Sequence, residues 1–257
     1  MDEEDPGSGL HHARVSPTAS SLSRRGPPRN SHSKDRIDGR VRAWPSSHFT
    51  PEIRMPSPID WYDSRASELA PRYEAIDPAR LHAWLADLLP GPGSRALDVG
   101  AGTGRDAAWL AGQGLHVIAV EPSRGMREQA SRHHPPDTVR WIDDCLPDLN
   151  ELHRLGLRAE LILLSAVWMH LAPAHRPRAF ERLAGLLAPG GLLAITLRSG
   201  PAPADSGMHP VSAPEVAQLA AAQGAAIVRR RDTPDAQGRP DVSWIAVAIR
   251  SGQAPVT

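Results

Sequence analysis

A glycine-rich turn after a short apolar segment constrains the fold of this 257-residue chain more than any other feature. Residues 95–106 read RALDVGAGTGRD, so 96–99 predict a strand, the glycines at 100, 102 and 104 predict a tight turn, and a helix begins after them. Glycines let a ligand approach the backbone, and the free amides at the helix N-terminus donate to it. The segment therefore predicts a strand-turn-helix unit that binds a flat, polar ligand.

The spacing of these glycines separates two ligand classes. A dinucleotide-binding turn has the order G-x-G-x-x-G, whereas Arg105 stands here in the place of the third glycine. Asp98 ends the preceding strand, where a carboxylate repels a pyrophosphate and pairs with an ammonium group. The pattern favours a zwitterionic ligand over NAD.

Strand and helix patterns alternate from residue 96 onward, which is typical of a parallel sheet with helices on both faces. We expect an α/β, Rossmann-like fold with a seven-stranded, mostly parallel sheet whose last strand is antiparallel. The predicted strands are 96–99, 116–120, 139–142, 161–164, 192–197, 225–229 and 242–249. The predicted helices are 61–73, 78–89, 104–113, 123–131 and 174–187, followed by one capped by Ser212.

Residues 97–104 (LDVGAGTG) resemble the first motif of the class I S-adenosylmethionine-dependent methyltransferases, in particular those of small molecules (type 11/25-like). Pro189-Gly190-Gly191 before the fifth strand is also typical of that family, and the resemblance covers about residues 61–250. It implies that Glu121, at the end of the second strand, accepts hydrogen bonds from both ribose hydroxyls of S-adenosylmethionine. Asp143, with Asp144 as the alternative, would accept from the adenine amino group. The implied cofactor site comprises Asp98, Gly100, Ala101, Gly102, Gly104, Glu121, Pro122, Met126, Asp143, Asp144 and Ser165.

Methyl transfer from a sulfonium needs alignment more than acid catalysis, so a base matters only where the acceptor loses a proton. His170, after the fourth strand, is the candidate base, and positioning a substrate or loop is its other interpretation. The candidate substrate contacts are Tyr62 and Tyr73 of a lid, Trp168, Arg198 and His209. Four of these residues also have a structural interpretation. The two tyrosines could fill an interface between the lid and the core, and Arg198 could pair with an acid at the rim of the sheet. His209 could be an exposed loop residue.

The predicted organisation is a disordered Pro/Ser/Arg-rich tail (1–57), a methyltransferase domain (58–251) whose N-terminal lid helices are 58–92, and a short tail (252–257). Residues 1–57 contain hardly any apolar run, so they bury too little surface to offset chain entropy.

Composition excludes several other classes. Lys+Arg and Asp+Glu number 29 each, with no basic stripe, so we expect no DNA partner. Cys145 is the single cysteine, and the pairs His133-His134 and Asp143-Asp144 lack metal-ligand spacing, so we expect no metal. No G-x-S-x-G hydrolase elbow occurs. No run reaches about 18 apolar residues and the N-terminus is acidic, so we expect a cytoplasmic protein without a membrane segment.

The sequence therefore predicts S-adenosylmethionine-dependent methyl transfer to a small-molecule acceptor. Two alternatives stay open, which are methylation of RNA or protein and a non-catalytic, S-adenosylmethionine-binding regulatory protein. The absence of an Asn-Pro-Pro-Tyr-type motif after the fourth strand weakens nucleobase methylation. The acceptor and the oligomeric state do not follow from the sequence.

Overall fold

The computed structural model describes residues 57–135 and 137–252. Except for Ser57, the predicted N-terminal tail lies outside the described residues, as do positions 253–257 of the predicted C-terminal tail. The two tails therefore stay predictions. Within the described ranges, no helix is long and apolar enough to cross a lipid bilayer.

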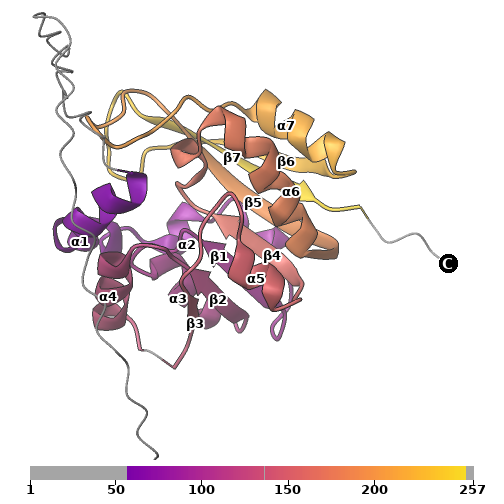
Figure 1. The fold of residues 1–257 in the computed structure, drawn as a ribbon, viewed down its shortest axis with the longest axis horizontal. Coiled ribbons are helices and arrows are strands. Elements are labelled where there is room, and N and C mark those ends of the chain that lie inside the picture. The colour runs from indigo at the N-terminus through magenta and orange to yellow at the C-terminus, as the bar shows by residue number, and fades with distance from the viewer. Residues whose placement is uncertain (1–56, 136, 253–257) are drawn as a thin grey trace, which may run out of the picture. The chain divides into compact units, whose positions relative to one another are not determined.

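A seven-stranded sheet in the order β3-β2-β1-β4-β5-β7-β6 forms the centre of the fold (Figure 1). β7 lies between β5 and β6 and runs antiparallel to both, while the other six strands run in one direction. The predicted mostly parallel sheet with an antiparallel last strand is confirmed. The strands are β1 Arg95–Val99, β2 His116–Val120, β3 Arg140–Ile142, β4 Ala159–Leu164, β5 Leu187–Ser199, β6 Ala226–Pro234 and β7 Ser243–Arg250.

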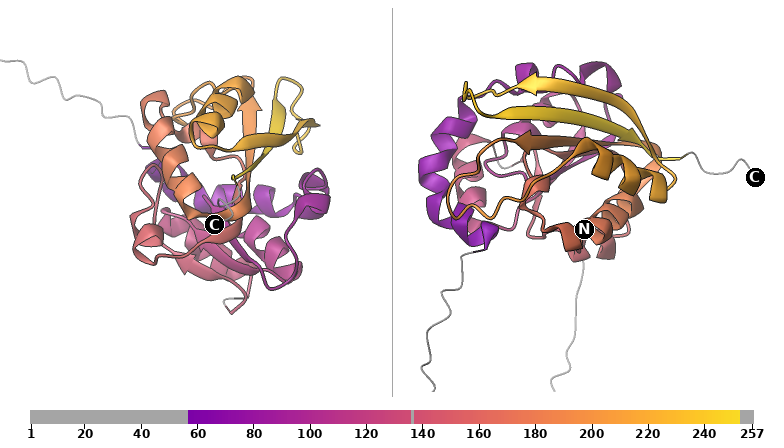
Figure 2. Two further views of the ribbon diagram at one scale, coloured as in Figure 1. Left: turned by 90° about the vertical axis from the view of Figure 1, so that its right-hand side faces the viewer. Right: turned by 90° about the horizontal axis from the view of Figure 1, so that it is seen from above.

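The sheet side chains alternate between two apolar layers, as expected for strands covered on both faces. Leu97 and Ile162 pack into the layer that contains α5, α6 and α7, whereas Ala96 and Leu161 pack into the layer with η1 and α3. Two views in Figure 2 show β6 and β7 at one edge of the sheet. The helices are α1 Pro58–Glu74, α2 Pro78–Leu81, α3 Arg105–Gly112, α4 Arg124–His133, α5 Asn150–Arg154, α6 Arg176–Leu186 and α7 Ala213–Ala222, with short 3-10 turns η1 Ala86–Leu88, η2 Trp168–His170 and η3 Pro173–His175.

The prediction of one helix over 78–89 is wrong. Asp77 caps the N-terminus of α2, but this helix ends at Leu81 and the chain continues through turns into η1. The reason is His82, which is fully buried, stacks on Trp109 with ring centroids 5.0 Å apart, and places Nε2 3.1 Å from Asp106. Packing of one polar ring thus overrides the helical pattern.

Candidate active site

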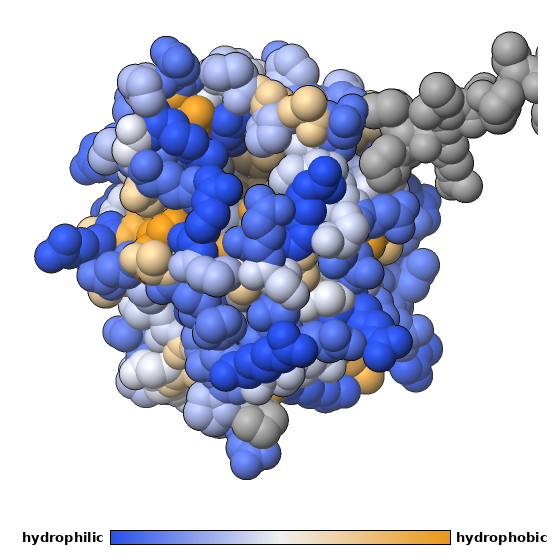
Figure 3. Space-filling view, turned by 90° about the vertical axis from the view of Figure 1, so that its left-hand side faces the viewer, coloured by the Kyte–Doolittle hydropathy of each residue, from blue (hydrophilic) through white to orange (hydrophobic). Residues whose placement is uncertain are grey.

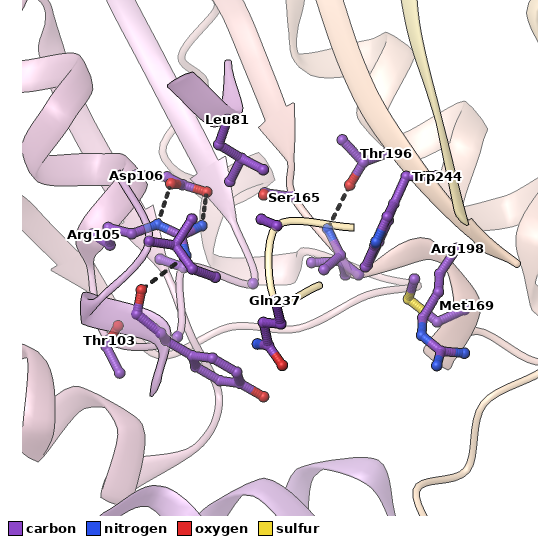
Figure 4. Close-up of a pocket in the computed structure, with 18 of the residues that line it drawn as sticks. Leu81, Thr103, Arg105, Asp106, Ser165, Met169, Thr196, Arg198, Gln237 and Trp244 are labelled. Atoms are coloured by element: carbon purple, nitrogen blue, oxygen red, sulfur yellow. Dashed lines mark hydrogen bonds and ion pairs between the residues drawn. The ribbon is translucent and has the colours of Figure 1, made fainter. Parts of the chain in front are cut away.

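A cavity of about 230 Å³ lies at the carboxyl edge of the parallel strands. The glycine turn, Glu121 and Met126 form the side next to β1 and β2, which we call the donor half. The opposite side, which we call the acceptor half, comprises Ser165, Ala166, Val167, Met169, His170, Thr196, Arg198, Met208, Trp244, and, from the end of β6 and the turn to β7, Thr233, Pro234, Asp235, Ala236, Gln237 and Arg239 (Figure 4). Helix α1 contributes Tyr62 and Tyr73 to the lining, and the face of the molecule that carries α1 is mainly hydrophilic (Figure 3).

Two glycines of the turn have different surroundings. Gly100 and Gly102 both have positive φ, +77° and +54°. A Cβ on Gly100 would lie 2.5 Å from Val167 Cγ2, whereas a Cβ on Gly102 meets no atom within 4 Å. Gly100 is therefore needed for packing, while Gly102 leaves open space at the cavity wall, as a ligand cradle requires.

The carboxylate of Glu121 is tied to this turn. It accepts hydrogen bonds from the backbone N–H of Gly102 and of Ser123, both at 2.8 Å. Burial raises the pKa of Glu121 above its ordinary value, although these two hydrogen bonds act in the opposite direction. Each carboxylate oxygen keeps a lone pair for a further donor from the cavity.

Asp98 is 1% exposed, and its Oδ2 has no hydrogen-bond partner among the described residues. Burial, followed by the charge of Asp106, raises the pKa of Asp98 well above its ordinary value. An unpartnered carboxyl oxygen in a cavity wall is costly without a ligand. Its chemistry suits a cationic hydrogen-bond donor.

Arg105 and Asp106, which the sequence analysis did not select, also line the cavity. Arg105 donates to both carboxylate oxygens of Asp106, at 2.8 and 3.0 Å, and to the carbonyl of Tyr73 at 3.1 Å. Although burial opposes it, His82 and Arg105 hold the pKa of Asp106 below its ordinary range. Arg105 thereby connects the start of α3 to the end of α1.

A second connection holds α1 over the donor half. Asp63 Oδ1 accepts from the backbone N–H of Gly125 at 2.7 Å and from Ser123 Oγ at 2.9 Å. These hydrogen bonds lower the pKa of Asp63. Ser123 is also the N-cap of α4, so one carboxylate joins α1 to the helix that follows Glu121.

Tyr62 and His170 meet inside the cavity. The Tyr62 hydroxyl lies 3.0 Å from His170 Nε2, and their rings pack edge to face. Burial lowers the pKa of His170 to about 4 and raises that of Tyr62 well above its ordinary value. At neutral pH both groups are therefore uncharged, and in the tautomer with its proton on Nδ1 the imidazole accepts a hydrogen bond from the phenol through Nε2.

The chain after β4 is held in a strained conformation. Ala166 has φ +60°, a left-handed value that non-glycine residues rarely adopt. Its N–H donates to Thr196 Oγ1 of the neighbouring strand β5 at 2.8 Å. Such strain often accompanies functional sites, and here it lies between Ser165 and His170.

The acceptor half contains a charge cluster that the sequence analysis missed, apart from Arg198. Asp235 accepts from Arg239 at 2.6 Å and from the indole N–H of Trp244 at 2.9 Å. The antiparallel pairing of β7 places Trp244 directly opposite Arg198. The sequence could have indicated this cluster, because an antiparallel last strand begins at the edge of the sheet where β5 ends, and its first residues therefore lie beside the site.

The cavity brings together most of the predicted site residues. Asp98, Gly100, Ala101, Gly102, Glu121, Met126, Ser165, Tyr62, Tyr73, His170 and Arg198 line it. Gly104, Pro122, Asp143, Asp144, Trp168 and His209 are not part of the lining.

Four of the residues outside the lining have other contacts. Asp143 pairs with Arg127 at 2.8 Å, and Asp144 accepts from the backbone N–H of Cys145 and of Leu152. Trp168 is fully buried in the core against Phe180, and the His209 N–H donates to the Met169 carbonyl at 2.7 Å. The described residues include no group of three or more His, Cys, Asp or Glu side chains arranged to hold a metal ion.

Comparison with known proteins places this geometry in a family. The sequence model of the methyltransferase domain family matches residues 73–229. An uncharacterised methyltransferase of Mycobacterium tuberculosis is 34% identical over 122 residues, which are 48% of this chain and 43% of that protein. The chain thus covers less than half the length of the curated relatives it matches.

Two solved structures share the fold. A 1,6-didemethyltoxoflavin-N1-methyltransferase of Burkholderia thailandensis is 24% identical with a TM-score of 0.53, over 75% of this chain and 81% of that chain. A magnesium protoporphyrin IX methyltransferase of Synechocystis is 15% identical with a TM-score of 0.59, over 75% of this chain and 97% of that chain. Because the family match extends over more than half of the sequence, the chain belongs to the methyltransferase domain family.

Proposed function

We propose that the protein binds S-adenosylmethionine in the donor half of the cavity and transfers its methyl group to a small molecule in the acceptor half. The observation that carries the proposal is the unpartnered, buried Oδ2 of Asp98 beside the glycine turn, in the same cavity as Tyr62 and His170. Membership of the methyltransferase domain family supports it.

The residues of the donor half fit this cofactor. Asp98 would take its ammonium group, because a carboxylate oxygen in a low-dielectric wall attracts a cationic donor. Glu121 would accept its ribose hydroxyls through the lone pairs that Gly102 and Ser123 leave free. The open space beside Gly102 would admit it close to the backbone.

When bound, S-adenosylmethionine supplies an electrophilic methyl group on a sulfonium whose leaving thioether is neutral. The chain then has two tasks, which are to align the acceptor and to receive its proton where one is lost. Tyr62 and His170 suit the second task when the phenol donates its hydrogen bond to Nε2, because the phenolic oxygen can then take the proton of the acceptor while its own proton passes to Nε2. Contacts through Arg105 and Asp63 fix α1, which carries Tyr62, beside the site.

A small-molecule acceptor fits the size of the cavity and its cover by α1 better than an RNA or protein chain does. The two solved structures named above are methyltransferases of low-molecular-weight compounds, which favours the same class for this protein.

Calorimetric titration with S-adenosylmethionine tests the donor half, with NAD as the comparison ligand. We expect S-adenosylmethionine to bind and NAD not to bind, and the reverse result would overturn the proposal. Transfer of labelled methyl into a metabolite mixture tests the reaction. Binding without transfer to any acceptor would favour the regulatory alternative.

A further inference from the structure

Three arginines line the cavity, and two of them have a carboxylate partner. Arg105 is paired with Asp106, and Arg239 is paired with Asp235. Arg198 has no carboxylate partner within the part of the chain that the structure describes. It is therefore the one lining arginine without an ion-pair partner among the described residues.

This unpaired charge is buried. Arg198 is 8% exposed, and burial together with the charge of Arg239 lowers its pKa, although the charge of Asp235 acts in the opposite direction. Its Nη1 and Nη2 donate to the carbonyls of Gly200 and Pro201 at 3.1 and 2.6 Å. A guanidinium has five N–H donors, so three remain, and a buried cation without a counterion is costly unless a ligand supplies one.

The residues around Arg198 indicate the shape and polarity of the rest of that ligand. In the β5–β7 ladder Arg198 stands directly opposite Trp244, so both side chains lie on the same face of the sheet (Figure 4). Asp235 holds the indole N–H of Trp244, which fixes the ring in the wall. Met169 and Met208 complete this part of the lining. The wall therefore offers one cation beside a fixed flat ring and two flexible apolar side chains.

We propose that Arg198 binds a carboxylate of the acceptor and that Trp244 contacts the acceptor's flat, apolar body. This inference rests on the proposed function and specifies its substrate class as aromatic or otherwise planar carboxylic acids. The planar fork of a guanidinium matches a carboxylate. A phosphate dianion would need a second free cation, and the described carboxylates already neutralise Arg105 and Arg239.

The reacting groups lie in the same wall. The positive charge of Arg198 contributes to the lowered pKa of His170. A carboxylate bound to Arg198 would offset that charge, so occupancy of this subsite would make the imidazole a stronger base. Binding of a carboxylate at Arg198 and the basicity of His170 are thus coupled through the Arg198 side chain.

The test uses benzoate and benzamide, which have the same size and planarity and differ in charge. Their binding is measured by calorimetry at constant ionic strength, with the full chain saturated with S-adenosylhomocysteine. In the wild type we expect benzoate to bind about tenfold more tightly than benzamide, because it gains charge-assisted hydrogen bonds. R198Q should remove this preference, and R198K should retain part of it because lysine keeps the charge without the fork.

R154Q is the matched control, because Arg154 is an exposed arginine that pairs with Glu151 on α5. It should bind benzoate as the wild type does. Equal binding of benzoate and benzamide by the wild type, no benzoate binding, or an unchanged preference in R198Q overturns the inference.

The affinity for S-adenosylhomocysteine is measured in parallel. Unchanged affinity in R198Q shows that the donor half is intact, so that loss of benzoate binding reports on Arg198 alone. If the wild type does not bind S-adenosylhomocysteine, the proposed function fails, and the charge preference of the free protein is then measured with the same two probes.

Discussion

The hydroxyl of Tyr62 in α1 lies 3.0 Å from Nε2 of His170 in the turn after β4. Removing either partner should slow methyl transfer, and removing His170 should leave cofactor binding unchanged because His170 lies in the acceptor half. We expect H170N to lower kcat by about a hundredfold and Y62F by about tenfold, the first being the usual contribution of a positioned base. H175N, a change of the exposed His175 in η3, is the control. Transfer at the wild-type rate in H170N would remove His170 from the mechanism.

The lowered pKa of His170 predicts the pH dependence of the rate. With a pKa of about 4, the imidazole stays neutral where an ordinary histidine, with a pKa of about 6.5, becomes protonated. We expect kcat/KM, which reports the titration of the free enzyme, to stay level between about pH 8 and 6 and to fall only toward about pH 4. A decline centred near about pH 6.5 would contradict the buried, neutral state of this ring.

The same shift affects stability. Between about pH 6.5 and 4 the unfolded chain binds a proton at His170 that the folded protein does not bind, so the free energy of unfolding decreases as the pH falls through this window. Urea titrations at several pH values measure this slope. In H170N the slope should be smaller by the contribution of one group.

Asp98 and Glu121 should determine cofactor affinity. We expect D98N and E121Q each to weaken S-adenosylmethionine binding by about ten- to a hundredfold, the usual range for hydrogen bonds to charged groups. Affinity should also weaken at lower pH in the wild type, because protonation of Asp98, whose pKa is raised, competes with the cationic ligand. E128Q on the exposed surface of α4 is the control. Wild-type affinity in both D98N and E121Q would refute the site assignment.

Alanine substitutions at Gly100 and Gly102 should have different effects on stability and on cofactor affinity. In G100A the added Cβ meets Val167, so we expect a lower melting temperature. In G102A it enters open space, so thermal stability should change little beyond the cost of positive φ, about 1 kcal/mol. Cofactor affinity should nevertheless fall in G102A. Calorimetric affinity combined with melting curves distinguishes the two cases, and a G102A protein with wild-type affinity would argue against a cofactor beside Gly102.

Asp63 should control how firmly α1 covers the cavity. D63N weakens the hydrogen bonds to Gly125 and Ser123, so we expect faster hydrogen exchange in α1 with unchanged exchange in the central strands. E68Q, an exposed change in the same helix, is the control. Equal protection of α1 in wild type and D63N would show that other contacts suffice to hold it.

Local sequence patterns were sufficient to predict the donor half. Gly100, Gly102 and Asp98 are within one strand-turn-helix unit, and Glu121 ends the neighbouring parallel strand at the same edge. The meeting of such residues follows from the direction of parallel strands. Local sequence patterns were therefore sufficient to predict that these residues of the β1 and β2 segments meet in one site.

Orientation within a short turn was not predictable in the same way. In η2, Trp168 faces the core whereas Met169 and His170 face the cavity, and one step along a 3-10 turn decides between them. Asp144 similarly bonds to the N–H of Leu152 in α5, a helix of five residues that is too short to leave a periodic signal. Tertiary packing determines both outcomes.

The acceptor half depends on contacts between distant segments. The end of β6 and the turn to β7 reach the cavity because β7 lies between β5 and β6, a topology that pairs Arg198 with Trp244 across the ladder. The periodicity of apolar residues predicted the strands, but it does not indicate which side chains pair with one another, such as Asp235 with Arg239.

Part of the acceptor half lies outside the segment that the family model matches. The match covers residues 73–229, so it begins after Tyr62 and ends before the turn between β6 and β7 and before Trp244. Under the proposed function, the donor half and Arg198 lie within the matched segment, while Tyr62, the turn between β6 and β7, and Trp244 lie outside it. Replacing only the hairpin between β6 and β7 should therefore redirect the enzyme to another acid while leaving its methyl donor unchanged.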